Sequence, residues 1–177
     1  MSKAYPIFIG DLAGVGTLIG NVFITVGHLF NDDAEAFVHI HGRSFRLTES
    51  QAFMISKIEN DKYYPDALDL AFFHLDGVME EEVKLASADP LINENLECCS
   101  FRMNKEANTL FASTKEAYLP FSTTCEVSQY CGNFFEAFSR NLLNKGDSGA
   151  PLFKENELVG ILSGGEPGTA RGRPLDV

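Results

Sequence analysis

The chain has 177 residues, 45% of them hydrophobic, which is enough to bury the core of one compact unit. Acidic side chains outnumber basic ones by 25 to 14, and the formal charge of −11 is relieved by no basic cluster, so no nucleic-acid partner is expected. Neither an apolar run of about 18 residues nor a signal-peptide pattern is visible, which predicts a chain without a membrane segment.

Short apolar or alternating runs between Gly, Asn, Asp and Pro residues predict an all-β fold. The expected strands of the first half are Tyr5–Ile9, Gly14–Ile19, Asn21–Thr25, Ala36–His41, Ser44–Leu47, Ala52–Ile58 and Asp69–Leu75. Those of the second half are Leu96–Met103, Thr109–Leu119, Thr124–Cys131, Pro151–Phe153, Leu158–Ser163 and Pro174–Val177. The acidic, turn-rich segment Asp76–Asn95 is the expected connector, which divides the chain into residues 1–88 and 89–177.

Two segments of the first half carry candidate catalytic residues. Ile24–His28 ends an apolar, β-branched run at a histidine, whose unperturbed pKa of about 6.5 suits a general base. Asp69 stands at the head of the apolar run Leu70–Leu75, which would anchor its backbone and aim its carboxylate inward. The competing carboxylates Asp66 and Asp76 adjoin Pro65 and Gly77, as solvated turn residues do.

The other histidines have weaker functional claims. His39 and His41 lie two residues apart on one face of an expected strand, a spacing that two metal ligands can have. A third ligand is not evident nearby, so a solvated strand face is expected and no metal site. His74 alternates with apolar neighbours and is expected to be structural. The segment Gly132–Asn144 has apolar residues at roughly helical spacing and is expected to form a packing helix or loop.

Gly146–Pro151 reads Gly-Asp-Ser-Gly-Ala-Pro and places Ser148 between two glycines. Glycine permits positive φ angles, so the amides of Gly146, Asp147 and Ser148 can converge into an oxyanion hole for a carbonyl that Ser148 attacks. Each such donor lowers the barrier by about 3–4 kcal/mol. These residues also suit an ordinary surface turn, so the motif alone leaves both interpretations open.

Three motifs in order, Thr25-Val26-Gly27-His28, Asp69-Leu70-Ala71-Phe72 and Gly146–Pro151, resemble the T-A-A-H, D-I-A-L and G-D-S-G-G-P signatures of chymotrypsin-like serine proteases. The resemblance implies two six-stranded antiparallel Greek-key barrels with the active site in the cleft between them. The N-terminal barrel would carry His28 and Asp69, and the C-terminal barrel Ser148 and the S1 pocket. It also implies peptide hydrolysis through an acyl-enzyme, with neither a metal nor an organic cofactor.

Substrate preference follows from two departures from relatives of known preference. Leu162 stands where relatives that cut after Gln or Glu have a histidine, and Leu142 stands where trypsin-like relatives have an aspartate. An apolar S1 pocket lined by Leu142 or Leu143 and Leu162 is therefore expected, with Ser163, Gly164 and Gly165 pairing with the substrate backbone. If S1 is polar instead, the first residues to consider are Thr169, Arg171 and Arg173.

Two absences bear on the branch of the family. The chain lacks an Ile-Val-Gly-Gly-like segment whose released terminus would pair with Asp147, so Asp147 needs another partner or stays solvated. Its four cysteines show no disulfide framework, which favours a reduced, intracellular compartment. Both traits resemble the small viral 3C-like and serine proteases. The expected substrate is a polypeptide, including the enzyme's own polyprotein, in the host cytoplasm. The alternatives are a bacterial or phage peptidase and a catalytically silent binding module with a collapsed oxyanion hole.

Overall fold

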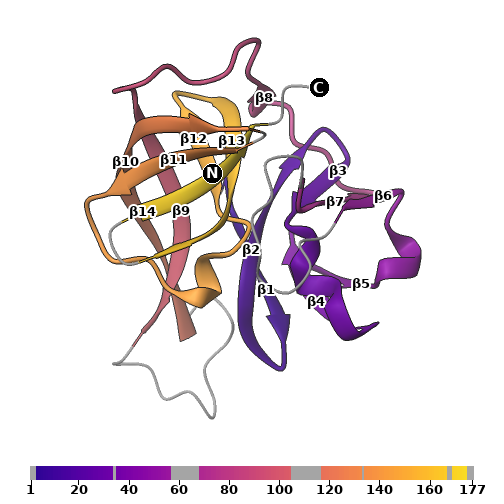
Figure 1. The fold of residues 1–177 in the computed structure, drawn as a ribbon. Helices are drawn as coiled ribbons and strands as arrows, with labels where there is room; N and C mark the ends of the chain where they lie inside the picture. The colour runs from indigo at the N-terminus through magenta and orange to yellow at the C-terminus, as the bar shows by residue number, and fades with distance from the viewer. Residues whose placement is uncertain are drawn as a thin grey trace.

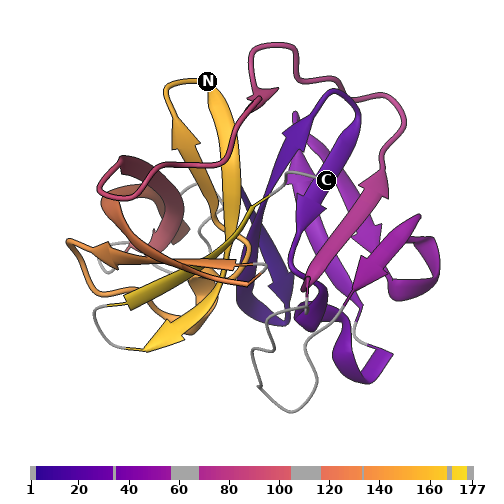
Figure 2. The ribbon, with the colours of Figure 1, turned by 45° about the horizontal axis from the view of Figure 1, so that its top comes forward.

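The computed structural model describes residues 3–33, 35–56, 68–104, 117–132, 134–166 and 169–174. Their strands form two curled sheets that lie side by side (Figure 1, Figure 2). The strand order is β5-β4-β1-β2-β3-β7-β6 in the first sheet and β12-β9-β10-β11-β14-β13-β8 in the second. The predicted all-β, two-barrel architecture is confirmed, although each sheet has seven strands rather than six.

The first sheet is formed by the N-terminal strands. Two short 3₁₀ helices, η1 (Gly27–Asp33) and η2 (Glu49–Gln51), connect some of these strands. The strands of this sheet are β1 (Tyr5–Ile9), β2 (Asp11–Ile19), β3 (Val22–Thr25), β4 (Ala36–Ile40), β5 (Arg43–Leu47), β6 (Met54–Ser56) and β7 (Leu70–His74). In β4 the burial alternates with period two, so that Val38 and Ile40 are buried while His39 is exposed. His41, just beyond β4, is exposed too, and the described residues contain no cluster that could hold a metal ion.

The second sheet closes into a barrel because β12 pairs with β13 as well as with β9. Its strands are β8 (Lys84–Leu85), β9 (Asn95–Met103), β10 (Tyr118–Cys131), β11 (Phe134–Ser139), β12 (Pro151–Lys154), β13 (Glu157–Glu166) and β14 (Thr169–Pro174). The closed ring has six strands, and β8 adds a seventh by parallel pairing with β13. The second sheet therefore takes residues from before position 89, and the boundary at residue 88 stays a prediction.

Several element predictions were wrong in detail. Gly132–Asn144 contains strand β11 instead of the expected packing helix or loop. Phe135 and Ala137 are buried in the barrel while Phe138 is exposed, which is the alternation of a half-buried strand. The runs near Tyr118–Leu119 and Thr124–Cys131 belong to one strand, β10, and the connector contains β8. Residues 57–58, 109–116 and 175–177 of the predicted strands, and Asp66, lie outside the described residues.

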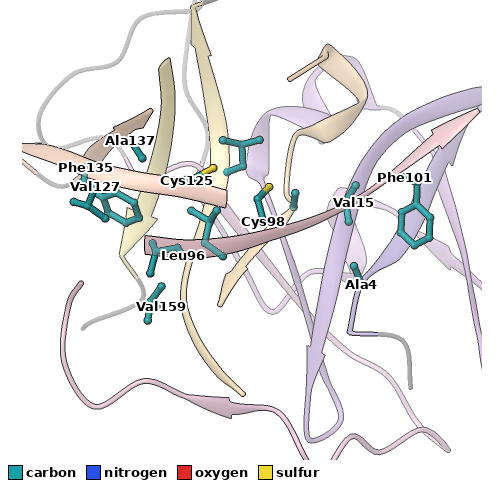
Figure 3. Close-up of a cluster of buried hydrophobic side chains, with 13 residues drawn as sticks. Ala4, Val15, Leu96, Cys98, Phe101, Cys125, Val127, Phe135, Ala137 and Val159 are labelled. Atoms are coloured by element: carbon teal, nitrogen blue, oxygen red, sulfur yellow. The ribbon is translucent and has the colours of Figure 1, made fainter. Parts of the chain in front are cut away.

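Three clusters of buried side chains form the core. One fills the first barrel, and another fills the second barrel around Leu96, Cys98, Cys125 and Phe135 (Figure 3). Ala4, which directly precedes β1, and Val15 of β2 belong to this second-barrel cluster. A third cluster joins the barrels, because it includes Ile24 and Leu70 of the first and Phe153, Leu158 and Ile161 of the second. The four cysteines, all within the described residues, are free.

Candidate active site

His28 lies in the first turn of η1, three residues after β3 ends, and Asp69 directly precedes β7, which pairs with β3. The pairing brings the two together across 41 residues of sequence, and His28 Nδ1 lies 2.8 Å from Asp69 Oδ2. The backbone N–H of His28 donates to the other carboxylate oxygen, also at 2.8 Å. An ionised carboxylate only accepts, so Nδ1 carries the proton and Nε2 is left with a free lone pair to act as a base.

Asp69 is completely buried, and its backbone is left-handed with φ of 51°. Aspartate tolerates this conformation better than most residues, and the apolar strand that follows fixes it in place. A third donor reaches the carboxylate from the other barrel, because the Ser163 hydroxyl lies 2.5 Å from Asp69 Oδ2. Sequence reasoning gave Ser163 a role in substrate pairing and missed this bond, since nothing local in the sequence links positions 94 residues apart.

Ser148 lies at the end of a one-turn 3₁₀ helix, η3 (Lys145–Asp147), in a turn held against both barrels. Val15 of β2 donates its N–H to the Ser148 carbonyl at 2.8 Å, and Gly149 donates to the Leu162 carbonyl at 2.7 Å. Gly149 has φ of +90°, and a Cβ there would lie 2.0 Å from the Val15 carbonyl oxygen, so glycine is required. Among the described residues no hydrogen bond joins the Ser148 hydroxyl to His28.

The three predicted oxyanion-hole residues lie in this turn, but their amides do not all point outward. The Ser148 N–H donates to the Lys145 carbonyl at 3.2 Å, and the Asp147 N–H donates to the Asn144 carbonyl at 3.1 Å. Within the described part of the chain, the Gly146 N–H makes no hydrogen bond. We call this arrangement of Lys145–Ser148 the closed turn. In it the Ser148 amide is occupied and cannot bind an oxyanion until the Lys145 carbonyl turns away.

Asp147 is paired with an arginine side chain and not with a chain terminus. Its carboxylate is 1% exposed and accepts from both terminal nitrogens of Arg102, Nη1 at 2.6 Å and Nη2 at 3.1 Å. Ser100 Oγ donates to it at 2.5 Å and the backbone N–H of Asn144 at 2.6 Å. The sequence posed the question of a partner for Asp147, but it could not identify a strand residue 45 positions away.

The residues predicted to line S1 differ in burial. Leu162 is 4% exposed and packs in the core of the second barrel, whereas the Leu142 side chain is 67% exposed. Leu143 is partly buried against the same core. Ser163 and Gly164 follow Leu162 in β13, where the pairing with β14 is irregular between Leu162 and Gly164. Gly165 pairs with Ala170 of β14, and the predicted S1 lining remains a prediction.

A family model settles which proteins this chain is related to. The model described as Trypsin matches residues 7–177, nearly the whole chain. The chain belongs to the trypsin family. It is thus a serine peptidase, and the matched region contains the motifs around His28, Asp69 and Ser148.

Solved structures with a similar fold include proteases of viruses and bacteria. The tobacco vein mottling virus protease matches with a TM-score of 0.66 at 14% identity, over 98% of this chain and 76% of the other. A human pathogenic astrovirus serine protease matches with a TM-score of 0.59 at 18% identity, covering 98% and 90%. An inactive mutant of Rv3671c from M. tuberculosis matches with a TM-score of 0.65 at 13% identity, covering 98% and 81%.

These identities support the shared fold and nothing finer. No curated protein sequence matches the chain. In the part of the chain that the structure describes, no helix is long and apolar enough to cross a membrane.

Proposed function

We propose that this trypsin-family peptidase is an endopeptidase that cleaves through an acyl-enzyme, with Ser148 as nucleophile, His28 as general base and Asp69 as the carboxylate that orients it. The observation that carries the proposal is the buried Asp69, which accepts hydrogen bonds from both the ring and the backbone of His28. A carboxylate held in this way fixes the histidine tautomer and stabilises the imidazolium formed during attack.

The reaction then takes two steps. The Ser148 oxygen attacks the scissile carbonyl while its proton passes to His28 Nε2, and the amine leaves with that proton as the acyl-enzyme forms. Water enters on the same path, gives its proton to His28 and releases the acid, and the proton returns to Ser148. The Ser163 hydroxyl and the backbone N–H of His28 hold the Asp69 carboxylate in place through both steps, because each donates a hydrogen bond to it.

The closed turn adds a conformational step before attack. A substrate carbonyl must displace the Lys145 carbonyl from the Ser148 N–H, which requires the peptide between Lys145 and Gly146 to rotate. The two donors would then be the amides of Gly146 and Ser148. Substrate binding thus assembles the site, a form of induced fit in which part of the binding energy drives the rotation.

The substrate is proposed to be a viral polyprotein, cleaved in the interior of the host cell. The viral proteases among the structural neighbours support this origin, as do the four free cysteines, which suit a reducing compartment. The neighbour from M. tuberculosis supports the second candidate, a bacterial or phage peptidase. The occupied Ser148 amide favours a third, a silent binding module in which the closed turn never opens.

A fluorophosphonate probe separates the enzyme from the silent module. The wild-type protein should be labelled at Ser148, as located by peptide mass mapping, and S148A should not be labelled. Heat-denatured protein serves as the control for non-specific reaction. Absence of labelling in folded wild-type protein would establish the silent module. The polyprotein substrate is tested with an inactive S148A precursor that carries the polypeptide segments flanking the protease. The active enzyme should cut this precursor at a defined boundary, and an uncut precursor would contradict the proposed substrate.

A further inference from the structure

The carboxylate of Asp147 is the most enclosed charge in the described part of the second barrel. It sits at the base of the turn that carries Ser148, with 1% of its side chain exposed. A buried carboxylate is tolerated only with a cation and enough donors to replace its lost water, and removing the cation alone is costly. Arg102, Ser100 and the Asn144 amide supply these partners, so that each oxygen of Asp147 accepts two hydrogen bonds.

Arg102 itself is fixed from three sides. Its guanidinium stacks over the Phe121 ring of β10 at 4.0 Å from the centroid. Nη1 also donates to its neighbour's carbonyl, that of Phe101, at 2.9 Å, and Nη2 donates to the Leu142 carbonyl at 3.2 Å. Ser100 and Arg102 both reach Asp147 from β9, because side chains two apart in a strand lie on one face. One guanidinium thus joins β9, β10, the loop at Leu142 and the Ser148 turn.

We infer that Arg102 is a positioning residue, which acts through Asp147 to hold the turn that presents Ser148. This inference rests on the proposed function. The chain carries its own cation for the aspartate before the nucleophile, so the turn is ordered without a newly released terminal amine. The Arg102–Asp147 pair is present while the turn is closed. Arg102 therefore fixes the position of the turn, whereas rotation of the Lys145–Gly146 peptide determines whether the Ser148 N–H is free.

The pairing has a consequence for pH dependence. A terminal amine titrates near pH 8, whereas a guanidinium stays charged above pH 12, so this anchor is independent of pH across the working range. The Arg102 guanidinium is hydrogen-bonded to the Asp147 carboxylate, and the Cys98 thiol lies near enough to interact with its charge. A hydrogen bond with Cys125 and burial raise the pKa of the Cys98 thiol well above its ordinary value, which keeps it neutral.

The test compares R102K and R102M with R46K and R46M, because Arg46 makes an exposed ion pair with Glu35 on the first barrel and provides a matched arginine away from the turn. Lysine keeps the charge but lacks the planar fork that spans Asp147 and Leu142. We expect R102K to lose about tenfold or more in kcat with KM nearly unchanged, and to gain an alkaline loss of activity that the wild type lacks. The Arg46 variants should match the wild type. Wild-type kcat and an unchanged pH profile in R102K would overturn the inference.

Hydrogen exchange separates failure of this inference from failure of the proposed function. Amides of the peptide spanning residues 142–150 should exchange faster in R102M than in the wild type, whether or not the protein is a working enzyme. If R102M does not fold, the double variant R102M/D147N removes both charges and should fold, still with faster exchange in that peptide. Unchanged exchange would refute the positioning role, whereas an inactive wild type with faster exchange in the variant would refute the peptidase mechanism alone.

Discussion

Asp69 takes up three hydrogen bonds in a left-handed backbone conformation that aspartate and asparagine adopt more readily than other side chains. D69N should therefore keep the fold, but its amide can donate to His28 Nδ1 and so select the wrong tautomer. We expect kcat to fall about 10⁴-fold with little change in the free energy of unfolding. D69A should lose both activity and stability, because alanine adds backbone strain of about 1–2 kcal/mol. Steady-state kinetics and urea unfolding check the pair, and an active D69N would remove Asp69 from the mechanism.

Gly146 provides a way to hold the turn closed. Its φ is not positive in the closed turn, and a Cβ there would lie 3.4 Å from the nearest atom of Leu12, an ordinary contact. Rotation of the Lys145–Gly146 peptide by about half a turn would make φ of Gly146 positive, a conformation that glycine adopts without strain and other residues do not. G146A should therefore fold as stably as the wild type yet lose about 10²-fold or more in kcat.

The matched control is the other glycine of the motif. G149A should be unstable, since its Cβ would overlap the Val15 carbonyl oxygen and the Thr25 hydroxyl. Thermal unfolding and binding of a peptide boronate, which requires the oxyanion donors, measure the two variants. Tight boronate binding by G146A would mean that the turn opens without a positive φ at this position.

At the scale of elements, the sequence predicted strands best where side chains alternate. β1 was predicted at its observed bounds, and β4 and β9 within a residue, since their buried residues recur with period two. The spacing of Phe134, Phe135 and Phe138 also fits a helix or loop, but in the structure this segment pairs with β10 and β14 and forms the strand β11. Arg171–Arg173 belongs to β14, which pairs with β11 on one side and with β13 on the other. Local sequence does not determine which distant strands a segment pairs with.

The segment before β9 is tied to the barrel through Tyr130 of β10, whose hydroxyl donates to the Pro90 carbonyl. Burial raises the pKa of Tyr130 to about 12, with nearby Asp89 and Glu94 adding to the shift. Since the folded protein holds the proton more tightly than the unfolded chain, this contribution to stability is full below pH 10 and is lost as the pH rises towards 12. Y130F should be less stable than the wild type by about 1 kcal/mol at pH 7. Urea unfolding should show this gap narrowing above pH 10, and a gap independent of pH would contradict the assignment.

At the scale of the whole molecule, the candidate site exists only where the barrels meet. The motifs predict which residues would carry the chemistry, because a nucleophile, a base and a carboxylate have to appear as particular residue types. Their support could not be predicted, since Ser163 reaches Asp69 from the other barrel and Arg102 reaches Asp147 from another strand. The hydrogen bond of the Ser148 N–H to the Lys145 carbonyl could not be predicted either, because it depends on the rotation of one peptide plane.

The two barrels should unfold together, because one strand contributes to both cores. Val15 and Leu18 lie in β2 of the first sheet, yet Val15 is buried in the second-barrel cluster and Leu18 in the first-barrel cluster. V15A and L18A should each lower the stability of a single shared transition, by about 2 and about 3 kcal/mol.

Loss of β-structure in urea, followed by far-UV circular dichroism, and loss of activity, which needs both barrels, should coincide for the wild type and for both variants. Under independent unfolding, V15A would shift only the part of the signal that comes from the second barrel, and circular dichroism would resolve two steps. The third core cluster argues against that outcome, since a barrel that unfolded alone would expose Ile24 and Leu70, or Phe153 and Leu158, to water. The shared core thus fixes the first barrel, which carries His28 and Asp69, against the second barrel, which carries Ser148.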